Sequence, residues 1–235
     1  MSERIRNLQF WLNQRGAYPP LLEDGEWGPI TRATLIEVFR NTSAAAVTDA
    51  DIEAIAGRLG CAARQIKAVA RVEGAGAGWD KDGLLKLLWE RHYLWRRVKI
   101  ALPLLSNSSP GGYTTDTDKD GINDSWEKLA DATGLFGFNV AAECASVGKF
   151  QVMGAHWKAL GYRSVADFYW RLSRSEAEHY EVFARYIEVN GLLPALRCVD
   201  GNPTNAEALA FGYNGSGGVA AGYHTKIAEA FRLEQ

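Results

Sequence analysis

The sequence contains little cysteine or methionine, no long apolar run and no strong excess of charge of one sign. Its three cysteines, Cys61, Cys144 and Cys198, are odd in number and scattered, which predicts small buried residues rather than a disulfide framework. No stretch approaches the roughly 18 apolar residues of a spanning helix, so we expect no membrane insertion. A net charge of −2 excludes the basic surface with which proteins bind nucleic acid.

What the chain does contain is a globular balance of residues with many aromatics. It has 235 residues, 47% of them hydrophobic and 23% charged, which suits one good-sized domain with a small appendage. Apolar residues recur at helical spacing, and no segment alternates convincingly, so we predict a mainly α fold in which any sheet would be a small ribbon near the loops. The polar start, MSERIRNLQF, lacks a signal-peptide core, so we expect synthesis in a cytoplasm.

A carboxylic acid lies where a helical apolar stripe predicts another hydrophobe. Ile66, Val69, Ala70 and Glu73 share one face of a predicted helix, and glycines from Gly74 onward end it. Apolar surroundings and the negative end of the helix dipole both disfavour the anion and raise the pKa of the carboxyl. Glu73 is therefore a candidate general acid. The alternative is a frayed surface glutamate at a helix end.

The segment Leu84 to Arg97 predicts a second helix, dense in leucine and tryptophan, with Glu90 in its middle. We take Glu90 as a second candidate catalytic residue. The alternative is a solvated ion pair with Lys86, which would lie one helical turn away.

Residues 1–42 read as a separate small unit of two helices joined by a turn. The first helix ends near Gly16 and the Pro19–Pro20 pair, and Thr31 is predicted to cap the second. The order LQxxL, DGxWGxxTxxxL and a terminal phenylalanine resembles the small helical peptidoglycan-binding module of cell-wall hydrolases. The alternative is a helical hairpin that only docks on the main domain.

An acidic loop contains the sharpest short motif in the chain. Oxygen ligands at positions one, three, five, seven, nine and twelve, with glycine at six, suit a hard cation. These positions are Asp116, Asp118, Asp120, Ile122 (through its carbonyl), Asp124 and Glu127. The loop, residues 116–127, resembles the calcium loops of thrombospondin-type repeats and dockerins, so we expect a structural calcium ion. The alternative is a solvated acidic turn.

Most of the remaining chain predicts short helices. One begins at Thr48 or Asp49, one follows Ser164, and a capping box begins another at Ser175. Asn205 is predicted to cap a helix that reaches Tyr213, and the last helix closes the chain from His224 to Leu233.

Four motifs occur in order between residues 47 and 235: VEGAGAGW, LWERHY, SVGKFQVMG and GYNG. Together they resemble the N-acetylmuramidase domain of phage endolysins, in the lysozyme-like superfamily. The resemblance implies that Glu73 is the general acid and that other motif residues bind the sugar. These residues are Glu90, Gln151, Tyr213 and Asn214; we also expect Tyr113, which lies outside the motifs, to bind the substrate. Two departures from the family pattern are Val147, in place of tryptophan, and the acidic loop inserted after Tyr113.

The resemblance implies a lysozyme-like helical domain that cleaves the β-1,4 bond between N-acetylmuramic acid and N-acetylglucosamine. We expect peptidoglycan as the partner, a monomer, no cofactor for catalysis, synthesis in a host bacterium and action on the wall after release. One alternative is a lytic transglycosylase, in which the muramyl 6-hydroxyl attacks in place of water. Another is a non-catalytic wall-binding protein.

Overall fold

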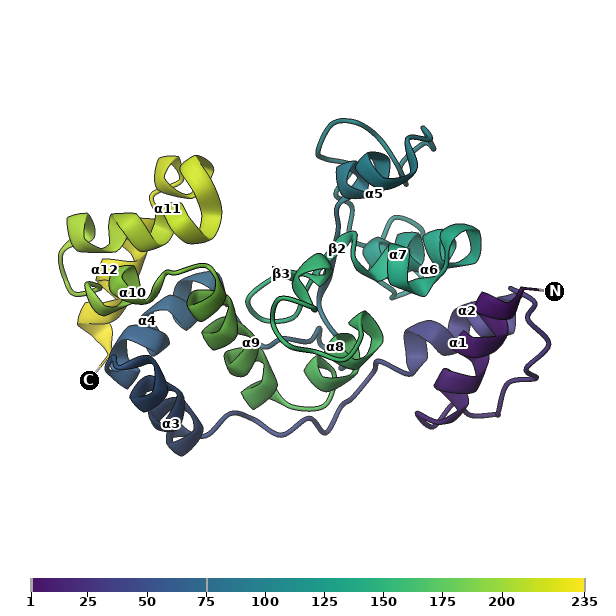
Figure 1. Cartoon of the computed structure of the whole chain (residues 1–235), viewed down its shortest axis with the longest axis horizontal. Helices are drawn as coiled ribbons and strands as arrows, with labels where there is room; N and C mark the ends of the chain where they lie inside the picture. Colours follow the sequence, from purple (N-terminus) through teal and green to yellow (C-terminus); the bar gives the residue numbers. More distant parts are fainter. Residues whose placement is uncertain (1, 75, 235) are drawn as a thin grey trace. The chain divides into compact units, whose positions relative to one another are not determined.

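The fold is mainly helical, as predicted. The computed structural model describes residues 2–74 and 76–234. Over these residues it has twelve α-helices, one 3-10 helix and three short strands (Figure 1). None of the helices in these two ranges is both long and apolar enough to cross a lipid bilayer.

Packing divides the chain into two compact units, each assembled from two separate stretches. Unit 1 combines Met1–Ser43 with Trp79–Ser173, and unit 2 combines Ala44–Gly78 with Arg174–Gln235. The predicted domains, 1–42 and 47–235, cut the chain at a different place. Packing groups the first 43 residues with the middle of the chain. The predicted boundary instead separated a wall-binding module from a catalytic domain.

Unit 1 consists of short helices around a small antiparallel sheet. Its strands are ordered β1-β2-β3, with Leu88 opposite Ser146 and Ser146 opposite Met153, so the predicted ribbon is confirmed. In chain order the elements are α1 (Glu3–Asn13), α2 (Pro29–Glu37), β1 (Leu87–Trp89), α5 (Arg91–Val98), α6 (Asp124–Phe136), α7 (Phe138–Ala142), β2 (Ala145–Val147), β3 (Val152–Met153), η1 (Gly154–His156) and α8 (Val165–Leu172).

The prediction of one helix from Leu84 to Arg97 is wrong. Residues 87–89 form β1, and α5 begins only at Arg91, so Glu90 lies at the junction between strand and helix. Leu84 and Leu87 are buried, and Leu88, which points to the other face of the strand, is half-buried. A short apolar run cannot by itself distinguish a buried strand from a buried helix.

The N-terminal helices belong to the hydrophobic core of unit 1. Phe39 stacks on Trp126 at 5.4 Å and on Phe138 at 6.0 Å between ring centroids, and Trp11 lies 6.5 Å from Phe138. Phe39 is fully buried. Aromatic rings of this size dominate the packing energy of a core. Residues from both stretches of unit 1 therefore stabilise one core.

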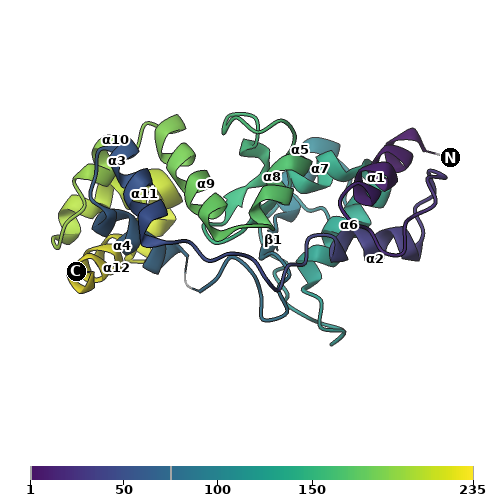
Figure 2. The same ribbon diagram turned by 90° about the horizontal axis from the view of Figure 1, so that it is seen from below.

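Unit 2 is entirely helical over its described residues. Helix α4 packs against α12, and α12 packs against α11 (Figures 1 and 2). Fully buried Leu59, Ile66, Phe183 and Ile187 supply its core. The helices are α3 (Asp49–Leu59), α4 (Ala63–Glu73), α9 (Glu176–Val189), α10 (Leu193–Arg197), α11 (Pro203–Ala220) and α12 (Tyr223–Leu233).

Helix starts were predicted with mixed success. Thr48 caps α3 through a capping box with Asp51, and the Ser164 hydroxyl accepts from the Asp167 amide at the start of α8. Thr31 does not cap α2: the helix begins at Pro29, and Thr31 is buried inside it. Asn205 does not cap α11 either, because Asn202 accepts from the Thr204 amide instead. In both cases a proline at the first helical position begins the helix earlier than predicted.

Candidate active site

Glu73 is the last residue of α4. The apolar stripe of the helix is buried, with Ile66 and Val69 at 0% and 1% exposure, and Gly74 takes the C-cap position. Glu73 is half-buried at the end of this stripe. Its carboxyl oxygen Oε1 accepts a hydrogen bond from Asn214 Nδ2 at 2.6 Å. The predicted helix, its end and the placement of an acid at that end are all confirmed.

The surroundings of Glu73 favour its protonated form. Burial raises its pKa from 4.5 to about 7, and this effect outweighs the hydrogen bond from Asn214 and the charge of Lys226, which both act the other way. An ordinary glutamate would be almost fully ionised at pH 7, whereas this carboxyl is protonated in about half of the molecules there. This is the protonation state that a general acid requires before it reacts.

Helix α11 brings Asn214 to Glu73 through a kink. Gly215 has φ 69° and ψ −168°, which breaks the helical path directly after Asn214. A side chain at Gly218 would meet Asn214 Cβ at 2.3 Å, so only glycine leaves room for the asparagine there. Gly215 of the GYNG motif thus allows the turn, and Gly218, three residues beyond the motif, allows the close approach that leaves room for Asn214.

Tyr213, the neighbour of Asn214, contributes mainly to packing. Its ring lies 5.1 Å from Tyr186 and 6.1 Å from Phe183, centroid to centroid, and burial raises its pKa well above the usual value. The structure thus brings Glu73, Tyr213 and Asn214 together in unit 2. Lys226 on α12 is a further charge acting on Glu73. Sequence reasoning missed it, because nothing in a lone lysine on a C-terminal helix indicates which carboxyl it faces.

Glu90 is the centre of a second group of polar side chains, in unit 1. Tyr113 Oη donates to Glu90 Oε2 at 2.9 Å, and His92 Nδ1 lies 3.2 Å from the same oxygen without hydrogen-bond geometry. Burial lowers the pKa of His92, although the charge of Glu90 opposes this shift. The partners of the carboxyl are therefore Tyr113 and His92, and the alternative ion pair with Lys86 is not formed among the described residues.

Gln151 lies in the tight turn between β2 and β3. Its amide is tied on both sides: Nε2 donates to the Gly148 carbonyl at 2.7 Å, and Oε1 accepts from Ser146 Oγ at 3.0 Å. Gln151 has φ 48°, a left-handed conformation that is uncommon outside glycine. Its side chain is exposed and held in a single orientation, although the sequence motif did not reveal Ser146 as its partner.

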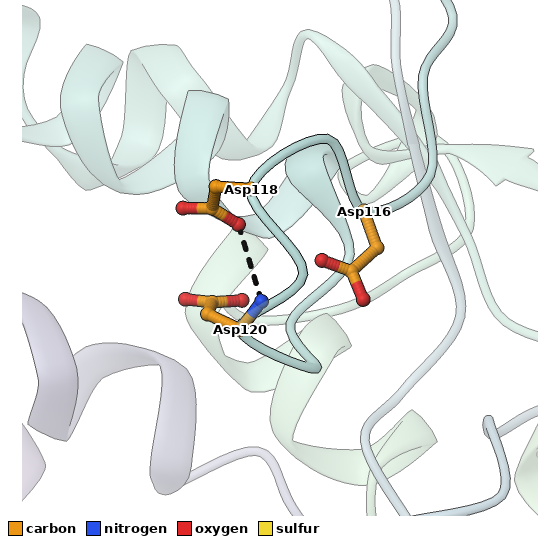
Figure 3. Close-up of side chains that lie close together, drawn as sticks. All are labelled: Asp116, Asp118 and Asp120. Atoms are coloured by element: carbon orange, nitrogen blue, oxygen red, sulfur yellow. Dashed lines mark hydrogen bonds between the residues drawn. The ribbon is translucent and has the colours of Figure 1, made fainter.

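The acidic loop brings together three of its six predicted ligands. Oxygens of Asp116, Asp118 and Asp120 lie within 4.8 Å of one another, and all three residues are exposed (Figure 3). The Asp120 amide donates to Asp118 Oδ1, and the Ile122 amide donates to Asp120 Oδ1 at 2.7 Å. This half of the loop has the turns that the spacing predicts.

The other two predicted carboxylate ligands point elsewhere. Desolvation opposes ionisation of Asp124, but hydrogen bonds from Thr114 and Thr117 outweigh it and lower the pKa of Asp124 to about 2. Glu127 pairs with Arg32 of α2 at 3.0 Å. Both residues lie in the first turn of α6 and serve local contacts there. The predicted six-ligand arrangement is therefore not assembled, and calcium binding stays a prediction.

The motif of the N-terminal segment is used for packing and turn formation. Gln9 is 1% exposed; its Nε2 donates to Asp24 Oδ1 at 2.8 Å, and its Oε1 accepts from the Gly25 amide at 2.8 Å. Trp27 packs directly on Gly134 of α6, where any side chain would collide with its ring. A pocket of about 550 Å³ lies beside these helices, and none of the predicted site residues lines it.

The sequence and the structure were compared with those of known proteins. Residues 62–234 match the model of the Muramidase family, described as N-acetylmuramidase. Among solved structures, the crystal structure of Burkholderia AP3 phage endolysin is similar to 99% of this chain and 94% of its own, with 31% identity and a TM-score of 0.70. No curated protein matches the chain.

Proposed function

Because the chain belongs to the N-acetylmuramidase family, we propose that it cleaves the β-1,4 bond between N-acetylmuramic acid and N-acetylglucosamine, with Glu73 as the general acid. The chain is a glycoside hydrolase of the lysozyme type, and its substrate is peptidoglycan. The observation that supports a role for Glu73 is its pKa of about 7, at the end of a buried helical stripe and under a hydrogen bond from Asn214.

The surroundings of Glu73 suit both halves of a proton transfer. Burial holds the proton on the carboxyl before reaction, so that it can be donated to the glycosidic oxygen as the bond breaks. The carboxylate that remains keeps the hydrogen bond from Asn214 and the nearby charge of Lys226, which both favour the anion. The same residues therefore limit the cost of the charge that develops during the reaction.

The test is the Glu73→Gln substitution, which keeps the shape and the hydrogen bond from Asn214 but removes the transferable proton. Clearing of permeabilised bacteria should fall by about two orders of magnitude or more while the protein stays folded. Glu229→Gln, an exposed site on α12 in the same unit, is the matched control and should clear normally. Near-normal clearing by folded Glu73→Gln would remove Glu73 from the mechanism.

The same assay separates the alternatives. Clearing by the wild-type protein excludes a purely wall-binding role. Mass spectrometry of the released muropeptides then separates hydrolysis from transglycosylation, because only a transglycosylase leaves 1,6-anhydro ends. We expect reducing ends, and 1,6-anhydro ends would assign the chain to transglycosylation instead.

We propose two further roles outside Glu73. Glu90 takes part in turnover, and the acidic loop binds a structural calcium ion through Asp116, Asp118, Asp120 and the Ile122 carbonyl. Support for calcium is the close approach of the three carboxylates, which repel one another without a cation. A cation held by protein oxygens has little left to activate water, so its effect should be on stability.

Wall binding by residues 1–42 is also a proposal. Among the large apolar side chains described in this segment, Tyr18, Leu22 and Ile30 are the most exposed, at 93%, 77% and 69%. An exposed aromatic ring such as that of Tyr18 suits the apolar face of a sugar better than a charged ligand. Tyr18→Ser in the Glu73→Gln background should reduce co-sedimentation with insoluble peptidoglycan. Unchanged co-sedimentation would contradict a contribution of Tyr18 to wall binding.

A further inference from the structure

The hydroxyl of Tyr113 is held on Glu90 by a loop that is anchored on both sides of the tyrosine. Lys128 Nζ of α6 donates to the Gly112 carbonyl at 2.9 Å and to Thr114 Oγ1 at 2.8 Å, so the two residues flanking Tyr113 are both tied to one ammonium group. The loop is therefore tied to α6 at this point.

A second side chain anchors the same loop a few residues earlier. Arg91 Nε donates to the Ser109 carbonyl at 3.0 Å, and Arg91 Nη2 donates to the Pro110 carbonyl at 2.9 Å. A side chain at Gly112, which has φ 74°, would meet Arg91 Nη1 at 3.0 Å, so glycine lets the loop lie directly on the guanidinium group. Two cations thus fix a segment that is otherwise rich in glycine, serine and proline.

The geometry at Glu90 leaves one carboxyl oxygen available. Oε2 accepts from Tyr113 at 2.9 Å and lies beside His92, whereas no hydrogen bond reaches Oε1 from the described residues. The Glu90 side chain is only 15% exposed, so its free oxygen is a shielded acceptor with a set direction. Half of the Tyr113 surface remains exposed, so the tyrosine is not needed to fill the core.

We infer that Tyr113 is a positioning residue for Glu90: the loop clamped by Arg91 and Lys128 holds its hydroxyl on Oε2 and thereby aims Oε1 at the reacting substrate or water. The inference rests on the proposed role of Glu90 in turnover. It replaces the sequence-based assignment of Tyr113 to substrate binding, because the polar end of the ring is already engaged. A carboxyl held by a charge-assisted hydrogen bond loses less freedom when it acts, which favours turnover more than binding.

The first test is Tyr113→Phe, which removes only the hydroxyl. Initial rates over a range of peptidoglycan concentrations should show kcat reduced about tenfold, the usual effect of losing one hydrogen bond to a carboxylate, with KM nearly unchanged. Glu229→Gln, at an exposed site on α12 to which no role is assigned, is the control and should keep the wild-type kcat. A normal kcat for folded Tyr113→Phe would overturn the inference.

A double-mutant cycle with Glu90→Gln distinguishes positioning from direct substrate contact. If Tyr113 acts through Glu90, adding Tyr113→Phe to Glu90→Gln should cost less than twofold more in kcat. Additive losses, or a loss in KM alone, would show that Tyr113 contacts the substrate itself and would overturn the inference. Lys128→Met should reproduce the kcat loss of Tyr113→Phe in part, since it releases both flanking residues. Full kcat in Lys128→Met would refute the clamp.

Failure of this inference is distinguishable from failure of the proposed function. An active Glu73→Gln protein would remove the general acid whatever Tyr113 does. An inactive Glu73→Gln protein together with fully active Tyr113→Phe would leave the proposed reaction standing and remove only the positioning role. Melting curves for every variant separate loss of turnover from loss of fold.

Discussion

A buried glutamic acid that holds its proton near neutral pH should change the stability of the protein with pH in a predictable way. The perturbation is Glu73→Gln, which replaces the titrating carboxyl with a permanently neutral group of the same shape. We compare the free energy of unfolding of the wild-type protein with that of this variant at each pH. Every other titrating group is shared by the two proteins, so the difference isolates Glu73.

The sign follows from the raised pKa. Below pH 4.5 the carboxyl is protonated in both folded and unfolded protein, and pH has no effect through this group. Between pH 4.5 and about 7 the folded protein binds more protons than the unfolded one, so the free energy of unfolding falls as pH rises. The loss nears completion as pH rises through about 7, and the difference is constant again roughly one pH unit higher.

The magnitude follows from the same two pKa values. They differ by about 2.5 pH units, and each unit corresponds to about 1.4 kcal/mol, which sets an upper limit of about 3 kcal/mol. Glu73 is half-buried, so solvent screening reduces this figure to about 2 kcal/mol. The Glu73→Gln protein should therefore gain about 2 kcal/mol over the wild type between pH 4 and pH 8.

The assay is denaturant unfolding followed by circular dichroism at pH 4 and pH 8. All eight tryptophans of the chain lie in unit 1, so tryptophan fluorescence reports that unit, whereas Glu73 lies in the all-helical unit 2. Glu229→Gln serves as the control and should show no pH-dependent difference from wild type. An equal difference between Glu73→Gln and wild type at both pH values would refute the raised pKa and with it the physical basis for a general acid.

Four other changes test the remaining conclusions. Asn214→Ala removes a hydrogen bond that favours the anion, so the pH at which activity declines should move upward, as measured by clearing rates from pH 5 to 9. Glu90→Gln should lower turnover by tenfold or more without a matching loss of melting temperature; full activity would return Glu90 to a structural role. Calcium at a hundredfold excess over its dissociation constant should stabilise the protein by about 2.7 kcal/mol. The double substitution Asp118→Ala with Asp120→Ala should abolish this response. If calcium, a chelator and the double substitution all leave the melting curve unchanged, the loop is only a solvated acidic turn. A chain that begins at residue 44 should lose the cooperative fluorescence transition of unit 1, because the core then lacks its N-terminal aromatics, and a retained transition would show that those residues are dispensable.

The N-terminal segment illustrates how the residues of a motif can have structural tasks while wall binding stays a prediction. Gln9 forms hydrogen bonds inside the segment, Trp27 packs on α6, and Phe39 stacks in the core of unit 1. These motif residues have structural tasks in this chain. A pattern of spacings is preserved by the needs of packing as well as by the needs of binding, so it cannot by itself reveal a ligand.

The position of Glu90 shows where local pattern was insufficient. The run of leucines before it predicted a helix, and the structure forms a strand because Leu88 pairs with Ser146, more than fifty residues later. A strand forms only when it pairs with another strand, which here is distant in sequence. The local pattern of apolar residues therefore gives no information about that pairing. A helix would have placed Lys86 one turn from Glu90. In the structure the hydrogen-bond partner of Glu90 is Tyr113, which lies in a loop 23 residues later.

The sequence alone determined the mainly helical fold and the end of the helix at Glu73, because these depend on local periodicity, glycine and proline. The order of the four motifs is read directly from the sequence. Only the tertiary structure decided that Asn214 lies 2.6 Å from Glu73, that burial raises the pKa of this acid to about 7, and that Tyr113 holds Glu90. Residues 73 and 214 are far apart along the chain, and desolvation depends on everything that packs around a group. The pKa of Glu73 therefore depends on the folded protein, whereas its position at the end of an apolar stripe can be predicted from neighbouring residues in the sequence.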